Sequence, residues 1–504
     1  MSAELYAVFA APVLGAALLL AIPRDVALRT HRFVTAAAVL AAMGGAARAL
    51  VRAIASGPYA SASFTVDEWR LGVVLAALLI TGAAIARGPA LAAGGIAALD
   101  DRAPADSVRD SALLLAATAC APLAALASST PIFALACVLT TACLTALAWN
   151  GSARVTASLM WRFALSDIAI ACGALLAASD GLLTPAEPRG VAAALLAAAA
   201  LLRAGSIPRS GDPLATEGRP ELGAVSLGVM RGQAFAIVGW LAVAQTDVRV
   251  WLAVAAAASA VWWARRAARD ATPAAALFAH ASLVVCGIAM ASPASTAGAV
   301  LLAAGATVAS AMFVLGRSGG RFAPTIGAAP LGATFAGAAA ISAAAVARGI
   351  VDAPSLAIGV LATAATCYLA LAGVGGFRLP QRDPASAIFG WLLLAFTAVF
   401  VVIPGLVTDA AAAQAARSLG AARALAPLEP PVGNDLGLAF AIAASAGMVA
   451  SMPRRDVAPV PHGAGAAPSH EMTPREARIV ISLLAASVAA SSALLWVGTR
   501  RGFL

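Results

Sequence analysis

Residues 191–228 read VAAALLAAAALLRAGSIPRSGDPLATEGRPELGAVSLG: an apolar run that ends in Arg203, then Pro208, a polar loop and the start of a second apolar run. A charge inside a bilayer costs about 2.5–3.5 kcal/mol on insertion scales, so such groups are usually paired or face water. Backbone groups freed near a proline are tolerated there only where they line a cavity or pair internally. The stretch therefore predicts a broken membrane helix with Arg203 at its end.

The composition of the whole chain is that of a membrane protein. Hydrophobic residues make up 61% of the 504 residues, charged residues 11%, and the mean hydropathy is +0.89; soluble domains have about 45–50% apolar and about 25% charged residues. Runs long enough to cross a hydrocarbon core lie near 5–22, 33–51, 71–86, 111–128, 131–149, 157–178, 190–208, 222–244, 249–264, 274–291, 296–316, 325–347, 354–376, 385–407, 434–452 and 477–498. They lack alternation, which predicts an all-α polytopic bundle of about 16 transmembrane helices, within a range of 14 to 16.

The distribution of basic residues predicts the orientation. All 33 basic residues are arginines, and most of them lie in loops that follow odd-numbered spans. The positive-inside rule then places the N- and C-termini on the outer, periplasmic face of a bacterial cytoplasmic (inner) membrane. The first span has no basic segment before it, so we interpret it as a retained helix. The net charge of +9 reflects these loops and lipid contact, and we expect no nucleic-acid partner.

No cofactor and no metal is expected. The six cysteines lie in apolar spans without a C-x-x-C pattern and are interpreted as small buried residues. His462 and His470 fall in the Pro/Gly/Ala-rich loop DVAPVPHGAGAAPSHEMTP, which we interpret as a flexible linker. The sequence has neither a dinucleotide fingerprint between a strand and a helix nor an iron–sulfur pattern.

Four charged residues stand out inside the predicted spans: Arg162, Asp167, Arg203 and Arg231. Arg162 and Asp167 are five positions apart, about 140° around a helix, so each needs a partner on another helix. Two interpretations remain open, interhelical ion pairs that fix the packing and a polar axis through the bundle. Arg162 has the further option of extending its guanidinium to the membrane interface.

Two patches of the opening stretch resemble the antiporter-like family. This family is shared by the proton-pumping membrane subunits of respiratory complex I, the Mrp cation antiporters, membrane-bound hydrogenases and the membrane partner of an inorganic-carbon uptake system. RAGSIP resembles its Gly-Lys-Ser-Ala-x-x-Pro run, with Arg203 at the lysine and Pro208 at the proline. EGRPELGAVSLG, residues 217–228, resembles its Glu-Gly-Pro-Thr-Pro-Val-Ser-Ala-Leu loop.

Other patches agree in order and spacing. SFTVDEWRLGVVLAALL is similar to the start of the family's third helix, and LACVLTTACLTALAW to its fifth. Asp167 of ALSD falls at an Arg-Val-Gly-Asp motif, and SAMFVLG, from Ser310, lies on the eleventh-helix Lys-Ala-Leu-Leu-Phe-Leu-Gly. The resemblance implies two inverted repeats with broken helices: N-terminal helices 1–3 in 1–110, the first repeat in 111–244, the second in 249–376, and C-terminal helices 14–16 in 385–504, with a flexible cytoplasmic loop near 453–475.

The departures from the family concern its proton relay. No acid lies near 136–138, where the fifth-helix glutamate is expected, Arg203 replaces one lysine and Ser310 replaces another. A relay needs groups whose pKa values can shift, whereas arginine stays protonated. We therefore expect a divergent ion-path or scaffold subunit with an eroded relay, whose partners are other membrane subunits and a soluble or peripheral catalytic subunit, and at most a non-catalytic part of a translocase.

Two alternatives have their own candidate residues. The first is an active proton or cation translocator that uses Asp167, Glu221 and His280, including the membrane partner of a proton-coupled inorganic-carbon transporter. His280 is a titratable base inside a predicted span. The second is a standalone small-anion transporter with Arg203 and Arg231 as counter-charges.

Overall fold

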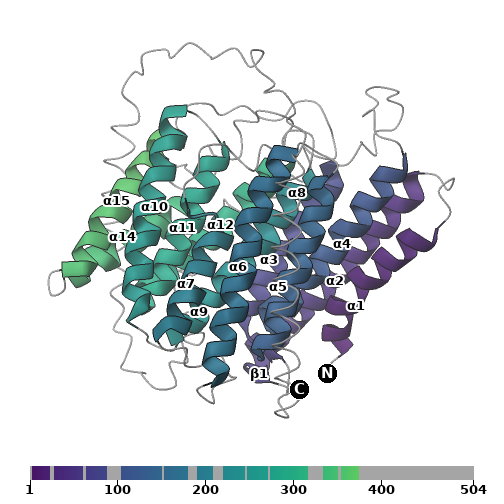
Figure 1. Cartoon of the computed structure of the whole chain (residues 1–504), viewed down its shortest axis with the longest axis horizontal. Helices are drawn as coiled ribbons and strands as arrows, with labels where there is room; N and C mark the ends of the chain where they lie inside the picture. Colours follow the sequence, from purple (N-terminus) through teal and green to yellow (C-terminus); the bar gives the residue numbers. More distant parts are fainter. Residues whose placement is uncertain are drawn as a thin grey trace.

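The computed structural model of the chain describes residues 3–22, 28–60, 64–87, 104–149, 153–179, 190–207, 220–243, 247–270, 273–315, 333–349 and 353–373. The predictions for Pro208, the linker histidines and the last three spans lie outside the described residues. Within them the chain forms a bundle of long, roughly parallel helices arranged in a broad row (Figure 1).

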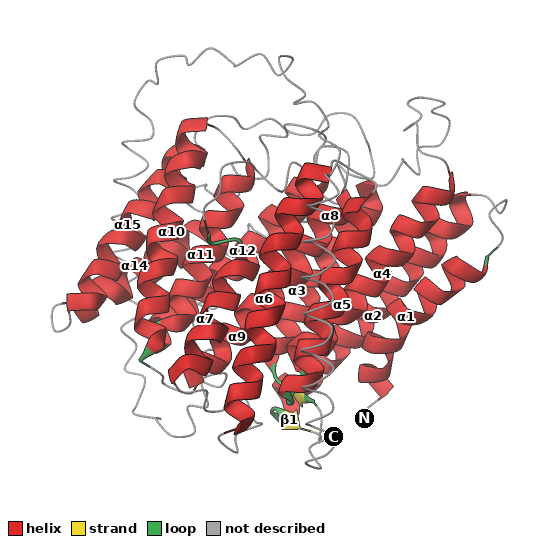
Figure 2. Ribbon diagram, in the orientation of Figure 1, coloured by secondary structure: helices red, strands yellow, loops and turns green. Residues whose placement is uncertain are grey.

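Helices lie on each of the first thirteen predicted spans. They are α1 (Ala3–Ala21), α2 (Leu28–Ser56), α3 (Glu68–Arg87), α4 (Pro104–Leu126), α5 (Thr130–Trp149), α6 (Ala153–Ser179), α7 (Gly190–Ala204), α8 (Pro220–Ala224), the π-helical η1 (Val225–Met230), α9 (Arg231–Val243), α10 (Val248–Asp270), α11 (Pro273–Ala289), α12 (Pro293–Leu315), α14 (Ala333–Gly349) and α15 (Ala353–Gly373). Among the described residues, 7 helices are long and apolar enough to cross a membrane. Several shorter helices are also apolar. Figure 2 shows the dominance of helix.

Consecutive helices pack side by side along the row. α1 contacts α2 and α4, and from α4 to α7 each helix packs on the next. α7 packs on α9, and α9 packs on α11. α10 packs on both α11 and α15. α3 closes the centre of the bundle by packing on α12 and on the helix formed by α8, η1 and α9. Among the long apolar helices of the described residues, the one formed by α8, η1 and α9 is the most buried, followed by α12.

Small residues allow this close packing. The interior is dominated by buried alanines, and without a hydrophobic drive between helices in lipid, close van der Waals contact supplies the attraction. Two backbones approach closely between α12 and α14, where a Cβ added at Gly337 would lie 2.5 Å from the carbonyl oxygen of Gly298. A glycine is required there because no side chain fits between the two backbones.

A short hairpin between α2 and α3 was not predicted. β1 (Tyr59–Ala60) and β2 (Thr65–Val66) pair antiparallel, with Tyr59 opposite Val66. Phe64 extends the hairpin with a bridge to Ala127, just after α4. The all-α prediction is correct for the bundle and wrong for this turn, whose strands of two residues are too short to produce a recognisable alternation.

Candidate functional site

The broken helix of the opening stretch ends earlier than predicted. The seventh span was expected to run to 208, but α7 ends at Ala204 because Gly205 adopts a φ of 75°. The Gly205 N–H donates to the Leu202 carbonyl (3.2 Å), and the Ser206 N–H donates to the Leu201 carbonyl (2.9 Å). This is a Schellman cap, which satisfies carbonyls at the end of a helix. The cap fixes Arg203 in the last turn, where a positive charge complements the helix dipole.

Side chains from other helices satisfy the polar groups beyond the cap. The Ser259 hydroxyl on α10 donates to the Ser206 carbonyl. The Ser282 hydroxyl on α11 lies 2.9 Å from the Ser206 hydroxyl. From α6, the Arg162 guanidinium donates to the Ile207 carbonyl at 3.1 Å. The interruption is therefore held by α6, α10 and α11, as polar backbone inside a bundle requires.

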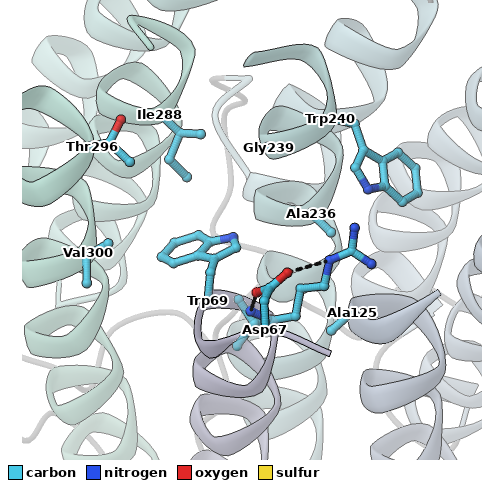
Figure 3. A pocket seen from close by; sticks show the side chains of 11 residues that line it. Asp67, Trp69, Ala125, Ala236, Gly239, Trp240, Ile288, Thr296 and Val300 are labelled. Atoms are coloured by element: carbon cyan, nitrogen blue, oxygen red, sulfur yellow. Dashed lines mark hydrogen bonds and ion pairs between the residues drawn. The ribbon is translucent and has the colours of Figure 1, made fainter. Parts of the chain in front are cut away.

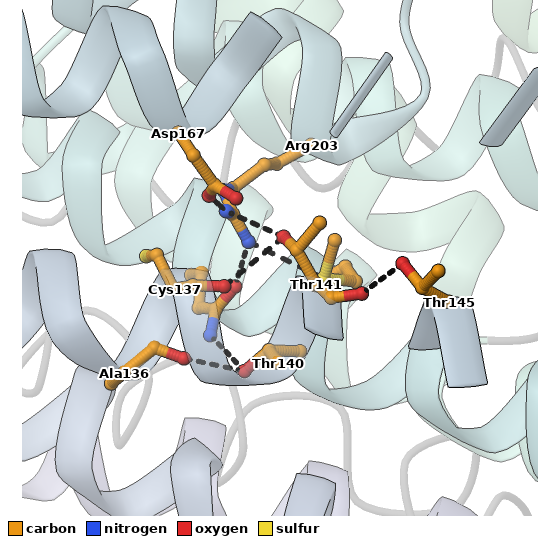
Figure 4. A network of polar contacts seen from close by, with 9 residues as sticks. Ala136, Cys137, Thr140, Thr141, Thr145, Asp167 and Arg203 are labelled. Atoms are coloured by element: carbon orange, nitrogen blue, oxygen red, sulfur yellow. Dashed lines mark hydrogen bonds and ion pairs between the residues drawn. The ribbon is translucent and has the colours of Figure 1, made fainter. Parts of the chain in front are cut away.

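A buried ion pair joins α6 to the end of α7. The Arg203 Nη2 donates to Asp167 Oδ1, and both side chains are 0% exposed. Figure 4 shows the carboxylate and the guanidinium pointing toward one another between the helices. Asp167 thus has a partner on another helix, as the sequence analysis required. Whether this pair belongs to an ion path remains a prediction.

Neutral polar groups complete the shell around Arg203. Its Nη1 donates to Gln233 Oε1 on α9 and lies 3.3 Å from the Met230 sulfur. Its Nη2 also lies 3.4 Å from the Thr141 hydroxyl on α5. The Gln233 amide in turn donates to the Thr140 hydroxyl at 2.9 Å. One guanidinium therefore connects α5, α6, α7 and α9.

The hydroxyls of α5 lie one turn from the position expected for the family's acid. Residues 136–138 contain no acid, and Thr140 and Thr141 follow Ala136 and Cys137 by four residues, which places them on the same helix face. Both hydroxyls also donate to carbonyls of the preceding turn, at 2.7 and 3.1 Å. The fifth helix thus offers the Thr141 hydroxyl to Arg203 and the Thr140 hydroxyl to Gln233, and the sixth helix supplies the carboxylate.

A second arginine lies inside the bundle, and no described carboxylate forms an ion pair with it. Arg231 follows the π-helical turn η1 and is 4% exposed. Its Nη1 lies 3.5 Å from the Ser310 hydroxyl on α12, and its guanidinium lies over the Phe278 ring at 5.4 Å. Its Nη2 has no hydrogen-bond partner in the described part of the chain. π-helical turns often occur at functional sites, and this one precedes Arg231 directly.

Two other candidates lie on other helices than the Asp167–Arg203 pair, which joins α6 and α7. Glu221 is in the first turn of α8, ten residues before Arg231 and about 15 Å away along the helix axis. His280 on α11 is 1% exposed, and neither ring nitrogen has a hydrogen-bond partner among the described residues. The structure therefore brings together Asp167 with Arg203, and Arg231 with Ser310.

A cavity of about 80 Å³ lies at the start of α3, lined by Asp67, Trp69, Arg70, Val73, Ala125, Ala236, Gly239, Trp240, Ile288, Thr296 and Val300 (Figure 3). Asp67 caps α3 by accepting from the Arg70 N–H at 2.8 Å and pairs with the Arg70 guanidinium at 3.2 Å. Burial raises the pKa of Asp67 above its usual value, while the Arg70 N–H and charge oppose that shift. The Arg70 guanidinium also donates to the Ala127 carbonyl at 3.0 Å. The cavity has room for two or three waters.

Thr140, Thr141, Gln233 and the serines around the α7 break also belong to this site but were not predicted from the sequence. Gln233 had a usable signal, since an amide in an apolar span two residues after Arg231 also needs a partner. Serine and threonine give no such signal, because in helices they bond to the carbonyl four residues earlier. Their role at this site depends on which helices are neighbours.

Replacing Gly205 with alanine should lower the free energy of unfolding by about 2–4 kcal/mol. The left-handed φ at this position is energetically unfavourable for alanine, whose Cβ approaches its own backbone. The added Cβ would also lie 2.3 Å from the Phe278 ring, and this overpacking destabilises the fold further. Unfolding by SDS in mixed micelles measures the change. Gly72→Ala is the matched control: it lies inside α3 with nothing within 4 Å of an added Cβ, and it should be neutral or stabilising by up to about 1 kcal/mol. Equal effects of the two substitutions would contradict the role given to the cap.

The sequence matches no protein-family model and no curated protein. Solved structures do share the fold. A chain of the Mrp complex from Dietzia sp. DQ12-45-1b matches with a TM-score of 0.64 and 15% identity, over 98% of this chain and 60% of that chain. A chain of the membrane-bound sulfane sulfur reductase, an archaeal respiratory membrane complex, matches with a TM-score of 0.60 and 15% identity. The match covers 81% of this chain and 77% of that chain. A chain of respiratory complex I from Thermus thermophilus matches with a TM-score of 0.53 and 18% identity. The match covers 80% of this chain and 98% of that chain.

These matches confirm the predicted resemblance at the level of the fold. The chain is a helical membrane protein with the fold of the antiporter-like subunits of Mrp and complex I-like assemblies. It spans 60% of the length of the Mrp chain. Identities of 15 to 18% carry no residue roles, so the function must be argued from the site itself.

Proposed function

We propose that the chain is an integral membrane subunit of a multi-subunit ion-translocating, proton-linked complex, in which it forms part of an ion path or a scaffold and carries an eroded proton relay. The observation that carries this proposal is the buried Asp167–Arg203 pair at the capped end of α7. The fold supports a membrane subunit, and the pair supports the loss of the relay.

The chain retains positive charge at the family's lysine positions but not groups that release protons easily. By the resemblance, Arg203 stands at the seventh-helix lysine and Ser310 at the eleventh-helix lysine. The Arg231 guanidinium approaches the Ser310 hydroxyl at 3.5 Å, so a fixed charge from α9 lies beside the second position. Arginine remains protonated in proteins. Both charges therefore act as constant electrostatic fields, which repel cations and orient water, and neither completes a relay.

The contacts of Arg203 link several helices, as expected for a residue with a structural role. Four helices meet at one guanidinium, and its carboxylate partner is Asp167 on the sixth helix, whereas the acid expected on the fifth helix is absent. A fully buried, paired charge holds its neighbours in a fixed arrangement, because separating the partners leaves an uncompensated charge. We infer that the pair sets the packing around the broken helix.

The proposal includes the organisation and placement of the chain. N-terminal helices in 1–110 precede two inverted repeats, in 111–244 and 249–376, and C-terminal helices follow in 385–504. The chain lies in the bacterial inner membrane with both termini on the periplasmic face. This placement follows the arginine-rich loops after odd-numbered spans.

The partners are other membrane subunits and a soluble or peripheral catalytic subunit. The test is to tag the chromosomal copy, solubilise the membranes in a mild detergent, and identify co-purified proteins by quantitative mass spectrometry. We expect at least one further multi-spanning protein in stoichiometric amount. An unrelated multi-pass protein with the same tag controls for detergent carry-over. Purification of the chain as an active monomer would contradict the proposal.

An active translocator is the second candidate, because titratable side chains remain in the interior. Asp167 Oδ2 and both His280 ring nitrogens have no hydrogen-bond partner among the described residues. Water at these atoms would provide steps for a proton. Proton flux through the isolated chain in liposomes separates this candidate from the eroded relay.

A further inference from the structure

Arg203 and Arg231 are buried to a similar degree but have different surroundings. Arg203 is 1% exposed and Arg231 is 4% exposed. Arg203 has a carboxylate, an amide oxygen and a hydroxyl within reach. Arg231 has one long contact to the Ser310 hydroxyl and one aromatic ring. Burial of a charge without a counter-charge is strongly unfavourable. Among the described residues no negative charge balances the Arg231 guanidinium, so a single negative charge would stabilise it.

The groups around Arg231 are neutral or can donate hydrogen bonds. The guanidinium has an unpartnered Nη2, and the Ser310 hydroxyl can rotate to donate. Phe278 covers one face of the guanidinium. His280 lies on the same helix as Phe278, α11, and neither of its ring nitrogens has a hydrogen-bond partner among the described residues. The described residues thus supply several donors and no acid.

We propose that a small monovalent anion, of the size of chloride or bicarbonate, binds beside Arg231 between α9, α11 and α12. The anion would accept hydrogen bonds from Arg231 Nη2 and the Ser310 hydroxyl, with His280 within electrostatic range. One negative charge neutralises one guanidinium, whereas a dianion would leave a net charge in the same interior. This site does not depend on the proposed subunit role, since it requires only the buried arginine.

The binding test uses the purified full chain in detergent, with sodium gluconate to keep the ionic strength constant. Equilibrium binding of radioactive chloride should saturate at about one ion per chain. Competition then identifies the ligand: displacement by bicarbonate at lower concentration than by unlabelled chloride indicates bicarbonate, and the reverse order indicates chloride. No saturable chloride binding to the wild-type chain would overturn the proposal.

Substitutions assign the site. Arg231→Gln should weaken chloride binding at least tenfold, and Ser310→Ala should weaken it severalfold. Arg266→Gln is the matched control, because Arg266 also lies over aromatic rings, at 5.6 and 5.7 Å from Trp262 and Trp263, but on α10. It should bind like the wild type. Unchanged binding in Arg231→Gln would place the ion elsewhere and overturn the proposal.

A thermal unfolding measurement distinguishes loss of the anion site in Arg231→Gln from a general folding defect. A ligand that binds only the folded state stabilises it in proportion to its occupancy. Chloride in place of gluconate should therefore raise the melting temperature of the wild type, but not that of Arg231→Gln. In gluconate alone, Arg231→Gln should melt no lower than the wild type, because the substitution removes an uncompensated charge. If it melts lower by the same amount in both salts, the charge has a partner within the chain and the proposal is wrong.

Discussion

Replacing Asp167 with asparagine should lower the free energy of unfolding by about 3–5 kcal/mol, the cost of removing one partner of a buried ion pair. The asparagine keeps the shape of the side chain but leaves the Arg203 guanidinium without a negative charge. Both side chains are fully buried, so solvent cannot replace the carboxylate. SDS-driven unfolding in mixed micelles measures the loss.

The double-mutant cycle with Arg203→Gln tests whether the two residues act on one another. Once Asp167 is neutral, neutralising Arg203 should restore a large part of the loss, because no unpaired charge remains. The Asp67–Arg70 pair, with side chains 21% and 19% exposed, is the matched control: Asp67→Asn should cost only about 1 kcal/mol, as expected for a partly exposed pair and a cap. Losses of Asp167→Asn and Arg203→Gln that add within about 0.5 kcal/mol would contradict the pairing.

The helices and the charges inside them were predictable from sequence. The length of the apolar runs gave a helix at each of the first thirteen predicted spans, and the cost of a charge in lipid singled out Asp167 and Arg203 as residues that need partners. The break after Arg203 was also foreseen; the predicted span ran on to 208, whereas α7 ends at Ala204, and Pro208 itself lies outside the described residues. Gly205 ends α7 first, through its left-handed φ, and a glycine in an apolar run does not by itself indicate a cap.

The choice of partners could not be predicted. The apolar face of a helix gives no rotation angle when nearly every side chain is apolar, so the sequence left both Arg203 and Arg231 open as partners of Asp167. The structure selects Arg203 because α6 packs on α7. The hydroxyls of Thr140 and Thr141 and the amide of Gln233 join this site for the same reason. The π-helical turn before Arg231 was not expected either, since its residues continue the same apolar pattern.

The isolated chain, reconstituted in liposomes, should show proton flux no greater than empty liposomes under an imposed pH gradient and membrane potential. A relay passes a proton only through groups that release it and take it up again. Arginine does not do so in proteins, and Arg203 is further held by a carboxylate and by Gln233. A pH-sensitive dye inside the liposomes measures the flux, with an uncoupler as the positive control.

Variants at Arg203 should change stability and assembly more than flux. Arg203→Ala leaves Asp167 unpaired, so it should destabilise the chain and reduce recovery with its partners, while flux stays at background. Arg203→Lys supplies a group that can deprotonate when buried, yet it should not create flux, because residues 136–138 hold no acid and Ser310 still stands at the second lysine position. Uncoupler-sensitive flux by the isolated chain that is lost in Asp167→Asn or His280→Ala would refute the eroded relay. That result would establish the chain as a working translocator whose protons move through Asp167 or His280 past arginines that stay charged throughout.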